Sequence, residues 1–239
     1  MIIVSAATPY ETEWITGKLL RPRSFAMGKF TALRGSIGNV SVIIFHLGVG
    51  KANAAHGATL LLENLEPGLF LLIGCGGAYR RSGLYPGELA VATEEIFGEE
   101  GVMTPRGWRS MKYLGFPLLR HERKYFYNRF PLDKKTVSRA KKILRGYPLK
   151  AGPFVTVSEV TGTLEKADEM ESRFSGICEN MEGAPVAQLC RLYGAPFLEV
   201  RGISNIVTRR NRKEWNLPAA MRISQQAAEQ IIANWRDNL

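Results

Sequence analysis

Two glutamates follow the first apolar segment of the chain. Ile2–Ala6 is continuously apolar or small, which predicts a short buried strand, and Glu11 and Glu13 lie in the turn and helix start that come after it. In an open α/β sheet, ligands bind at the carboxyl ends of the strands, so we expect one of these carboxylates at the ligand crevice. There a carboxylate can act on a bound molecule as a hydrogen-bond acceptor or a base. The alternative is that both glutamates only stabilise the start of a helix through its dipole.

The second chemically suggestive stretch is Leu69–Ala78, with the sequence LFLLIGCGGA. Five apolar residues without alternation predict a parallel strand that is buried on both faces. The cluster Gly74-Cys75-Gly76-Gly77 permits unusual backbone angles and removes side chains that would block a ligand, so we place the active site at this end of the strand. A tight strand-to-helix turn is the alternative interpretation.

Strands and helices alternate along most of the chain, which indicates the α/β class. The residues at 36–39, SIGN, predict a turn that joins two strands in a hairpin. Segments expected to form strands are 2–6, 30–35, 40–47, 69–78, 88–92, 154–157 and 197–203. Segments expected to form helices begin at about residues 11, 53, 134, 164 and 184, with a last helix over 218–235.

The length of 239 residues suits one domain, since no linker, repeat or low-complexity tract divides the chain. No apolar run reaches the roughly 18 residues of a membrane span, and the first residues lack the basic region of a signal peptide. We therefore expect a cytoplasmic protein without membrane contact. The spacing of the three cysteines, Cys75, Cys178 and Cys190, argues against a disulfide framework and a zinc site, and we expect neither a metal nor a cofactor.

The net charge of +10 is concentrated in one segment. Residues 106–150 contain 14 Lys and Arg against two acidic residues, a net +12, while the rest of the chain carries 18 basic and 20 acidic residues. Much of the excess lies on the helix expected after Asp133, with Val137, Ala140 and Leu144 facing inward. We favour a solvated basic face; attraction of an anionic substrate comes next. Nucleic-acid binding comes last, because no recognition motif accompanies the charge.

Several motifs occur together in an order that resembles the nucleoside phosphorylase/nucleosidase superfamily. They are HLGVGKANAA at 46–55 with GATLLL at 57–62, GCGG at 74–77, NMEG at 180–183 and RGISN at 201–205. The chain is most similar to the hydrolytic branch, methylthioadenosine/S-adenosylhomocysteine nucleosidase and futalosine hydrolase. The resemblance covers nearly the whole chain. It implies a three-layer α/β sandwich over residues 1–239, with a mixed, largely parallel sheet flanked by helices. It also implies a homodimer that cleaves the N-glycosidic bond of a purine nucleoside.

The resemblance also implies roles for single residues. The water-activating glutamate of the family falls on Glu11, with Glu13 as the fallback, and the ribose-binding pair falls on Met181 and Glu182. An oxocarbenium-like sugar makes both carboxylates useful, one to hold the hydroxyls and one to take the proton of the attacking water.

At the base end, the resemblance places purine-holding backbone at Val160. We expect Cys75 and Gly76 of the glycine cluster and Arg209 of the segment 209–215 to contact the substrate as well.

Asn205 is the main departure from the family pattern, because the methylthioadenosine nucleosidases carry an aspartate there. An amide offers two donors and an acceptor, whereas a carboxylate only accepts. Asn205 can therefore donate to O6 of a purine and accept from N7–H, which favours 6-oxopurines and hypoxanthine as the leaving group. The alternative is a strand-end asparagine that satisfies only backbone groups.

Hydrolysis is favoured over phosphorolysis, because residues 6–14 contain none of the arginines that bacterial phosphorylases of the superfamily use for phosphate. Together with Asn205, this resembles futalosine hydrolase of menaquinone biosynthesis, whose substrate carries a benzoate that the basic excess could attract. The alternatives are a methylthioadenosine/S-adenosylhomocysteine nucleosidase and a 6-oxopurine nucleoside phosphorylase. A non-catalytic nucleoside- or nucleic-acid-binding protein is a further alternative from a different class.

Overall fold

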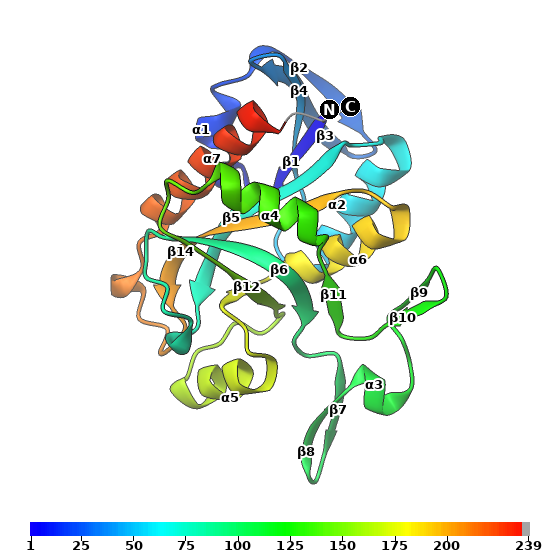
Figure 1. Ribbon diagram of the computed structural model, residues 1–239, viewed down its shortest axis with the longest axis vertical. Helices are drawn as coiled ribbons and strands as arrows, with labels where there is room; N and C mark the ends of the chain where they lie inside the picture. The colour runs from blue at the N-terminus through cyan, green and yellow to red at the C-terminus, as the bar shows by residue number, and fades with distance from the viewer. Residues whose placement is uncertain (236–239) are drawn as a thin grey trace.

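The fold is organised around strand β5 (Leu69–Ala78), which lies between two parallel neighbours. These are β1 (Ile2–Ala6) and β14 (Phe197–Ile206) (Figure 1). The five apolar residues at the start of β5 have no exposed surface, so the prediction of a strand buried on both faces is confirmed. The computed structural model describes residues 1–235.

Ten strands form one mixed sheet, in the order β11-β6-β12-β13-β5-β1-β4-β3-β2, and β14 pairs with both β5 and β6. Pairing is parallel for β1 with β4 and β5, for β5 with β14, and for β12 with β6 and β13. It is antiparallel elsewhere, including β13 with β5 and β14 with β6. The remaining strands are β2 (Leu20–Met27), β3 (Phe30–Ile37), β4 (Val40–His46), β6 (Leu89–Phe97), β11 (Arg129–Pro131), β12 (Leu149–Thr156) and β13 (Cys178–Asn180).

Helices cover both sides of this sheet, which confirms the predicted α/β class (Figure 1). Helix α7 (Leu217–Asn234) packs on β14 and β5, with the short α1 (Glu13–Thr16) beside it. Helix α2 (Lys51–Asn64) packs against α6 (Gly183–Tyr193). Helix α5 (Leu164–Phe174) follows the carboxyl end of β12.

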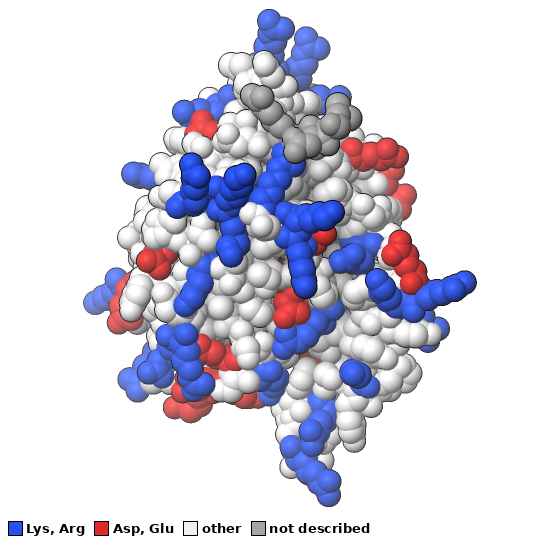
Figure 2. All heavy atoms as spheres, in the orientation of Figure 1, with Lys and Arg blue, Asp and Glu red and all other residues white. Residues whose placement is uncertain are grey.

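The basic segment is more regular than the sequence predicted. It holds parts of two small hairpins and a short helix that extend away from the main sheet (Figure 1). Helix α4 (Lys134–Ile143) forms as predicted, with Asp133 accepting from the Thr136 N–H at its start and Val137 and Ala140 buried. Figure 2 shows Lys and Arg side chains gathered over the place of α4. The small elements are β7 (Gly101–Thr104), β8 (Gly107–Ser110), α3 (Met111–Leu114), β9 (Leu119–His121) and β10 (Lys124–Phe126).

Three strands of the sheet, β2, β11 and β13, were not predicted from the sequence, and β11 has only three residues. Strand β2 lies at the edge of the sheet and is mostly exposed, so it lacks an apolar pattern and owes its form to pairing with β3. Strand β13 has only three residues. Over residues 1–235, no helix is long and apolar enough to cross a membrane.

Candidate active site

A cavity of about 280 Å³ opens where the carboxyl ends of β1, β5 and β14 meet. These strands are parallel, so the segments that follow each of them converge at one edge of the sheet. The cavity is lined by Ala7, Thr8, Tyr10, Glu11, Val49, Cys75, Gly76, Gly77, Val160, Thr161, Glu179, Asn180, Met181, Glu182, Arg201, Ser204, Asn205, Val207, Arg210, Trp215, Leu217 and Met221.

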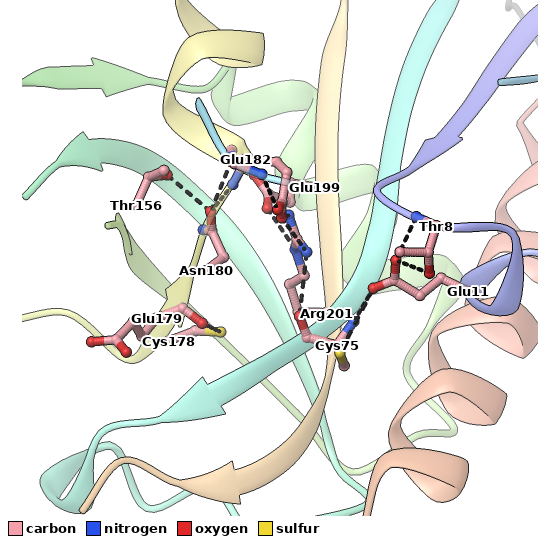
Figure 3. A network of polar contacts seen from close by, with 12 residues as sticks. Thr8, Glu11, Cys75, Thr156, Cys178, Glu179, Asn180, Glu182, Glu199 and Arg201 are labelled. Atoms are coloured by element: carbon pink, nitrogen blue, oxygen red, sulfur yellow. Dashed lines mark hydrogen bonds and ion pairs between the residues drawn. The ribbon is translucent and has the colours of Figure 1, made fainter. Parts of the chain in front are cut away.

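Glu11 ends the 3₁₀ helix η1 (Pro9–Glu11) that follows β1, and only 6% of its surface is exposed. Its Oε2 accepts from the backbone N–H and the hydroxyl of Thr8, both at 3.0 Å (Figure 3). Its Oε1 accepts from the Cys75 N–H at 3.1 Å. These three donors fix the carboxylate and leave lone pairs for a molecule in the cavity. Glu13, by contrast, is exposed and does not line the cavity.

The glycine cluster makes room for the side chains of the site. A Cβ atom on Gly74 would lie 2.6 Å from Oε1 of Glu11 and 2.8 Å from Nη1 of Arg201. A Cβ on Gly76 would lie 2.5 Å from Sγ of Cys178. The glycines were expected to let a ligand approach the backbone, and at Gly74 and Gly76 it is protein side-chain atoms that occupy the space of a Cβ.

Glu182 precedes α6 and is 4% exposed. Its Oε1 accepts from the Gly50 N–H at 3.0 Å, and its Oε2 accepts from both Nη atoms of Arg201 at 3.3 Å (Figure 3). Gly50 has φ 90°, in the left-handed region that glycine adopts readily. In this conformation its N–H donates to Glu182. Burial raises the pKa of Glu182, while Arg201 and the Gly50 N–H oppose this rise.

Arg201 lies between these carboxylates and is 2% exposed. Its Nε donates to Glu199 at 2.8 Å, and its Nη1 donates to the Cys75 carbonyl at 3.2 Å. Burial alone would lower the pKa of Arg201, but Glu199, Glu182 and Glu11 together raise it well above its usual value. The guanidinium therefore stays charged and holds the carboxylate wall of the cavity together.

Asn205 also lines the cavity and is half-buried. Its Oδ1 accepts from the Ser204 hydroxyl at 2.7 Å, and its Nδ2 donates to the Ile206 carbonyl at 3.2 Å. Each bond uses one of the two acceptor sites and one of the two N–H groups. One acceptor and one donor thus remain for a bound molecule.

Two carboxylates fasten the loop at 158–163 over the cavity. Glu99 accepts from the N–H groups of Ser158 and Glu159 at 2.7 and 2.8 Å, and it also receives Lys51 Nζ at 2.9 Å. Glu179 accepts from the Thr161 N–H at 3.0 Å and from its hydroxyl at 2.5 Å.

Most residues named from the sequence come together here. Met181, Val160, Cys75 and Gly76 line the cavity with Glu11, Glu182 and Asn205. Arg209 does not line it.

The next residue, Arg210, lines the cavity instead, and its guanidinium stacks 5.4 Å from the Trp215 ring centre. Within residues 1–235, the cavity wall takes nothing from the basic segment 106–150, and no cluster of three His, Cys, Asp or Glu side chains could hold a metal ion.

Sequence reasoning assigned no role to Arg201, Gly50 or Thr161. Arg201 and Gly50 both lie inside the motifs RGISN and HLGVGK, so a signal was present. Thr161 lies outside these motifs, so no signal in the sequence pointed to it.

Comparison with known proteins identifies relatives along nearly the whole chain. Residues 1–234 match the Phosphorylase superfamily. Futalosine hydrolase of Thermus thermophilus is 30% identical over 204 residues, which cover 85% of this chain and 86% of that protein. A 5'-methylthioadenosine/S-adenosylhomocysteine nucleosidase of Exiguobacterium sp. is 30% identical over 175 residues, which cover 72% of this chain and 70% of that protein.

Among solved structures, one similar fold is that of 5'-methylthioadenosine/S-adenosylhomocysteine nucleosidase from Neisseria meningitidis in complex with methylthio-immucillin-A. It matches with a TM-score of 0.83 at 21% identity and covers 97% of both chains. This likeness confirms the predicted fold, and the match over residues 1–234 confirms the resemblance seen in the motifs. The chain belongs to the phosphorylase superfamily.

Proposed function

We propose that this protein hydrolyses the N-glycosidic bond of a purine nucleoside, with futalosine as its substrate and hypoxanthine as the released base, in menaquinone biosynthesis. The observation that carries the proposal is that one cavity is lined by Glu11, by Glu182 paired with Arg201, and by Asn205. Relatives at 30% identity include both futalosine hydrolases and methylthioadenosine/S-adenosylhomocysteine nucleosidases, so the choice between them rests on the site.

In this mechanism, Glu182 accepts from the 2′ and 3′ hydroxyls of the ribose, and Glu11 takes a proton from the water that attacks C1′. The bond between C1′ and the purine nitrogen breaks with its electron pair going to the base, which takes a proton from solvent at N7. With its free acceptor site, Asn205 accepts a hydrogen bond from N7–H of the base. With its free N–H, it donates a hydrogen bond to O6.

Water is favoured over phosphate as the nucleophile because of how Arg201 is paired. Its donors are shared among Glu199, Glu182 and the Cys75 carbonyl, so it has little left for a phosphate dianion. Arg210 is the other arginine of the cavity wall within residues 1–235, and it lies beside Trp215.

We also propose a homodimer, as the resemblance implies. Tyr10 and Val49 line the cavity and remain largely exposed in the single chain, and a second subunit would cover them.

The test is chromatography of products after incubation with futalosine, its 6-amino counterpart, methylthioadenosine and inosine, each with and without phosphate. We expect hypoxanthine from futalosine and no effect of phosphate, with Glu182→Gln as a control of strongly reduced activity. Preferential cleavage of methylthioadenosine would support the nucleosidase alternative, and a requirement for phosphate would support the phosphorylase. Absence of cleavage of every nucleoside by folded protein would contradict the proposal.

A further inference from the structure

A second pair of carboxyl groups lies behind the cavity wall. Glu95 on β6 and Glu199 on β14 have no exposed surface. Their side chains meet beneath the first residue of α6, because a Cβ atom on Gly183 would collide with Oε1 of Glu95 and with Oε2 of Glu199. Glycine at position 183 is therefore what lets the two carboxyl groups approach each other under the helix.

The hydrogen bonds of this pair are complete except at one atom. Glu95 has Thr156 Oγ1 at 2.6 Å from its Oε2 and receives Asn180 Nδ2 at 2.8 Å on its Oε1. Oε1 of Glu199 accepts a hydrogen bond from Nε of Arg201. Oε2 of Glu199 has no hydrogen-bond partner among the residues that the structure describes. A buried oxygen of this kind needs a donor, and the adjacent Oε1 of Glu95 supplies one if it carries a proton.

The charged groups around the pair also favour a proton on Glu95. Burial and the charge of the neighbouring Glu199 raise the pKa of Glu95 well above its usual value. Glu199 instead forms an ion pair with the Arg201 guanidinium, at 2.8 Å between Nε and Oε1. The other charged or titratable groups around the pair are Glu182 on the far side of Arg201 and the thiol of Cys178 on β13.

We propose that Glu95 and Glu199 share one proton, held on Glu95, so that the pair presents a single negative charge to Arg201 and thereby fixes the guanidinium against Glu182. The two residues are positioning residues for the carboxylate that would bind the ribose, and this part of the inference rests on the proposed function.

The position of the charge matters because Arg201 divides its donors between two carboxylates. Nε contacts Glu199 at 2.8 Å, whereas the Nη atoms contact Glu182 at 3.3 Å. If the charge moved from Glu199 to Glu95, Arg201 would lose its nearest anion and be drawn toward Glu182, which would compete with a ligand for that carboxylate.

The test compares Glu95→Gln with Glu199→Gln. Each replaces one oxygen of the same buried pair by NH₂, and each costs some stability. Glu95→Gln keeps the charge on Glu199 and can donate to it, at the loss of the bond from Asn180. We expect kcat to fall by about threefold or less. Glu199→Gln moves the charge to Glu95, and we expect kcat to fall by about thirtyfold or more. A purely structural role would give the two variants similar losses of activity and thermal stability.

Two measurements decide the inference without reference to activity. Infrared difference spectra of wild type minus each variant, in D₂O near neutral pD, should show the C=O band of a protonated carboxyl. Crystal structures should keep the wild-type distances between Arg201 and Glu182 in Glu95→Gln and show Arg201 shifted toward Glu182 in Glu199→Gln. Absence of the band, or an unmoved Arg201 in both variants, would overturn the inference. A wild type that cleaves no nucleoside but shows the band and the displacement would contradict only the proposed function.

Discussion

Glu182 is held from two sides, by the Gly50 N–H and by Arg201. If it binds the ribose hydroxyls, Glu182→Gln keeps the shape but removes the charge that both contacts and the hydroxyls need. We expect kcat/KM for futalosine to fall by about 10²-fold, since hydrogen bonds to a charged group contribute about 1.5–3 kcal/mol. Near-normal turnover in a protein with unchanged circular dichroism would remove Glu182 from the site.

Glu11 is the proposed base, and its two oxygens are oriented by Thr8 and Cys75. Glu11→Gln retains these contacts in part but cannot accept a proton, so kcat should drop by roughly 10²-fold or more while KM changes little. Glu13→Gln is the matched control, since Glu13 is exposed and lies outside the cavity wall. Loss of activity in Glu13→Gln alone would show that the wrong glutamate has been assigned.

Asn205 has one donor and one acceptor free, the pair that a departing 6-oxopurine requires. A 6-amino purine would face the amide with donor against donor, and an unpaired buried group costs about 1–3 kcal/mol. We expect the wild type to prefer futalosine over its 6-amino counterpart, and Asn205→Asp to narrow or reverse that preference. Measuring kcat/KM for both substrates with both proteins checks this. An unchanged ratio would mean that Asn205 does not read position 6.

At the scale of elements, the start of α2 positions two parts of the cavity wall, Glu182 and the loop at 158–163. Gly50 donates to Glu182, and the next residue, Lys51, pairs with Glu99, which fastens the loop at 158–163. A shift of this helix end would therefore disturb the carboxylate wall and the loop together.

Gly50→Ala tests this element, since an alanine at φ 90° is strained even though space is open around it. We expect a loss of about 1 kcal/mol in the free energy of unfolding, together with a rise in KM as Glu182 loses its donor. Gly38→Ala is the control, because Gly38 has φ 56°, equally open surroundings and a position in the β3–β4 turn away from the cavity. It should cost similar stability and leave kinetics unchanged. A rise in KM in both variants would contradict a specific role for Gly50.

The elements that the sequence predicted well are those whose cause is local. The apolar run of β5, the Asp133 cap of α4 and the Thr163 cap of α5 are each legible within a few residues. Strand β2 was missed because it is mostly exposed and has no apolar pattern of its own, although its partner β3 is adjacent in the chain. Strands β11 and β13 were missed because each has three residues and forms by pairing with strands that lie farther away in the chain.

The residues of the site fall into the same two groups, those that a local motif predicts and those whose contacts depend on the tertiary arrangement. Glu11, Glu182 and Asn205 could be named because each ends or begins a recognisable element within a motif. The pairing of Arg201 with Glu182 depends on the tertiary arrangement, since these residues lie 19 residues apart on different elements. The proton proposed for Glu95 depends on it still more, because three strands and a helix start enclose that residue.

At the scale of the whole molecule, the basic excess and the cavity are separate. The basic residues of α4 lie on the surface (Figure 2). Arg210 is the exposed arginine at the cavity wall within residues 1–235. Charge can still raise the encounter rate of an anionic substrate over a distance, and salt screens this effect.

We therefore expect kcat/KM for futalosine to fall more steeply with ionic strength than that for neutral inosine. Arg210→Gln should raise KM for futalosine by about tenfold. Arg209→Gln, a change of the same charge on the same loop, should have little effect. Equal salt responses for the two nucleosides, or equal effects of the two substitutions, would show that the charge serves another purpose.

The pairing of Gly50 with Glu182 also bears on how the protein acquires its activity during folding. These partners are 132 residues apart in the chain, and Cys75 and Arg201 are separated by 126 residues. Contacts between such distant segments close large loops and form late, after helices and local hairpins. During refolding, helical circular dichroism should therefore return before enzymatic turnover. In a nascent chain whose β14 segment has not yet emerged from the ribosome, Arg201 is absent from the fold. The contacts that orient the carboxylates of the cavity wall are then absent as well.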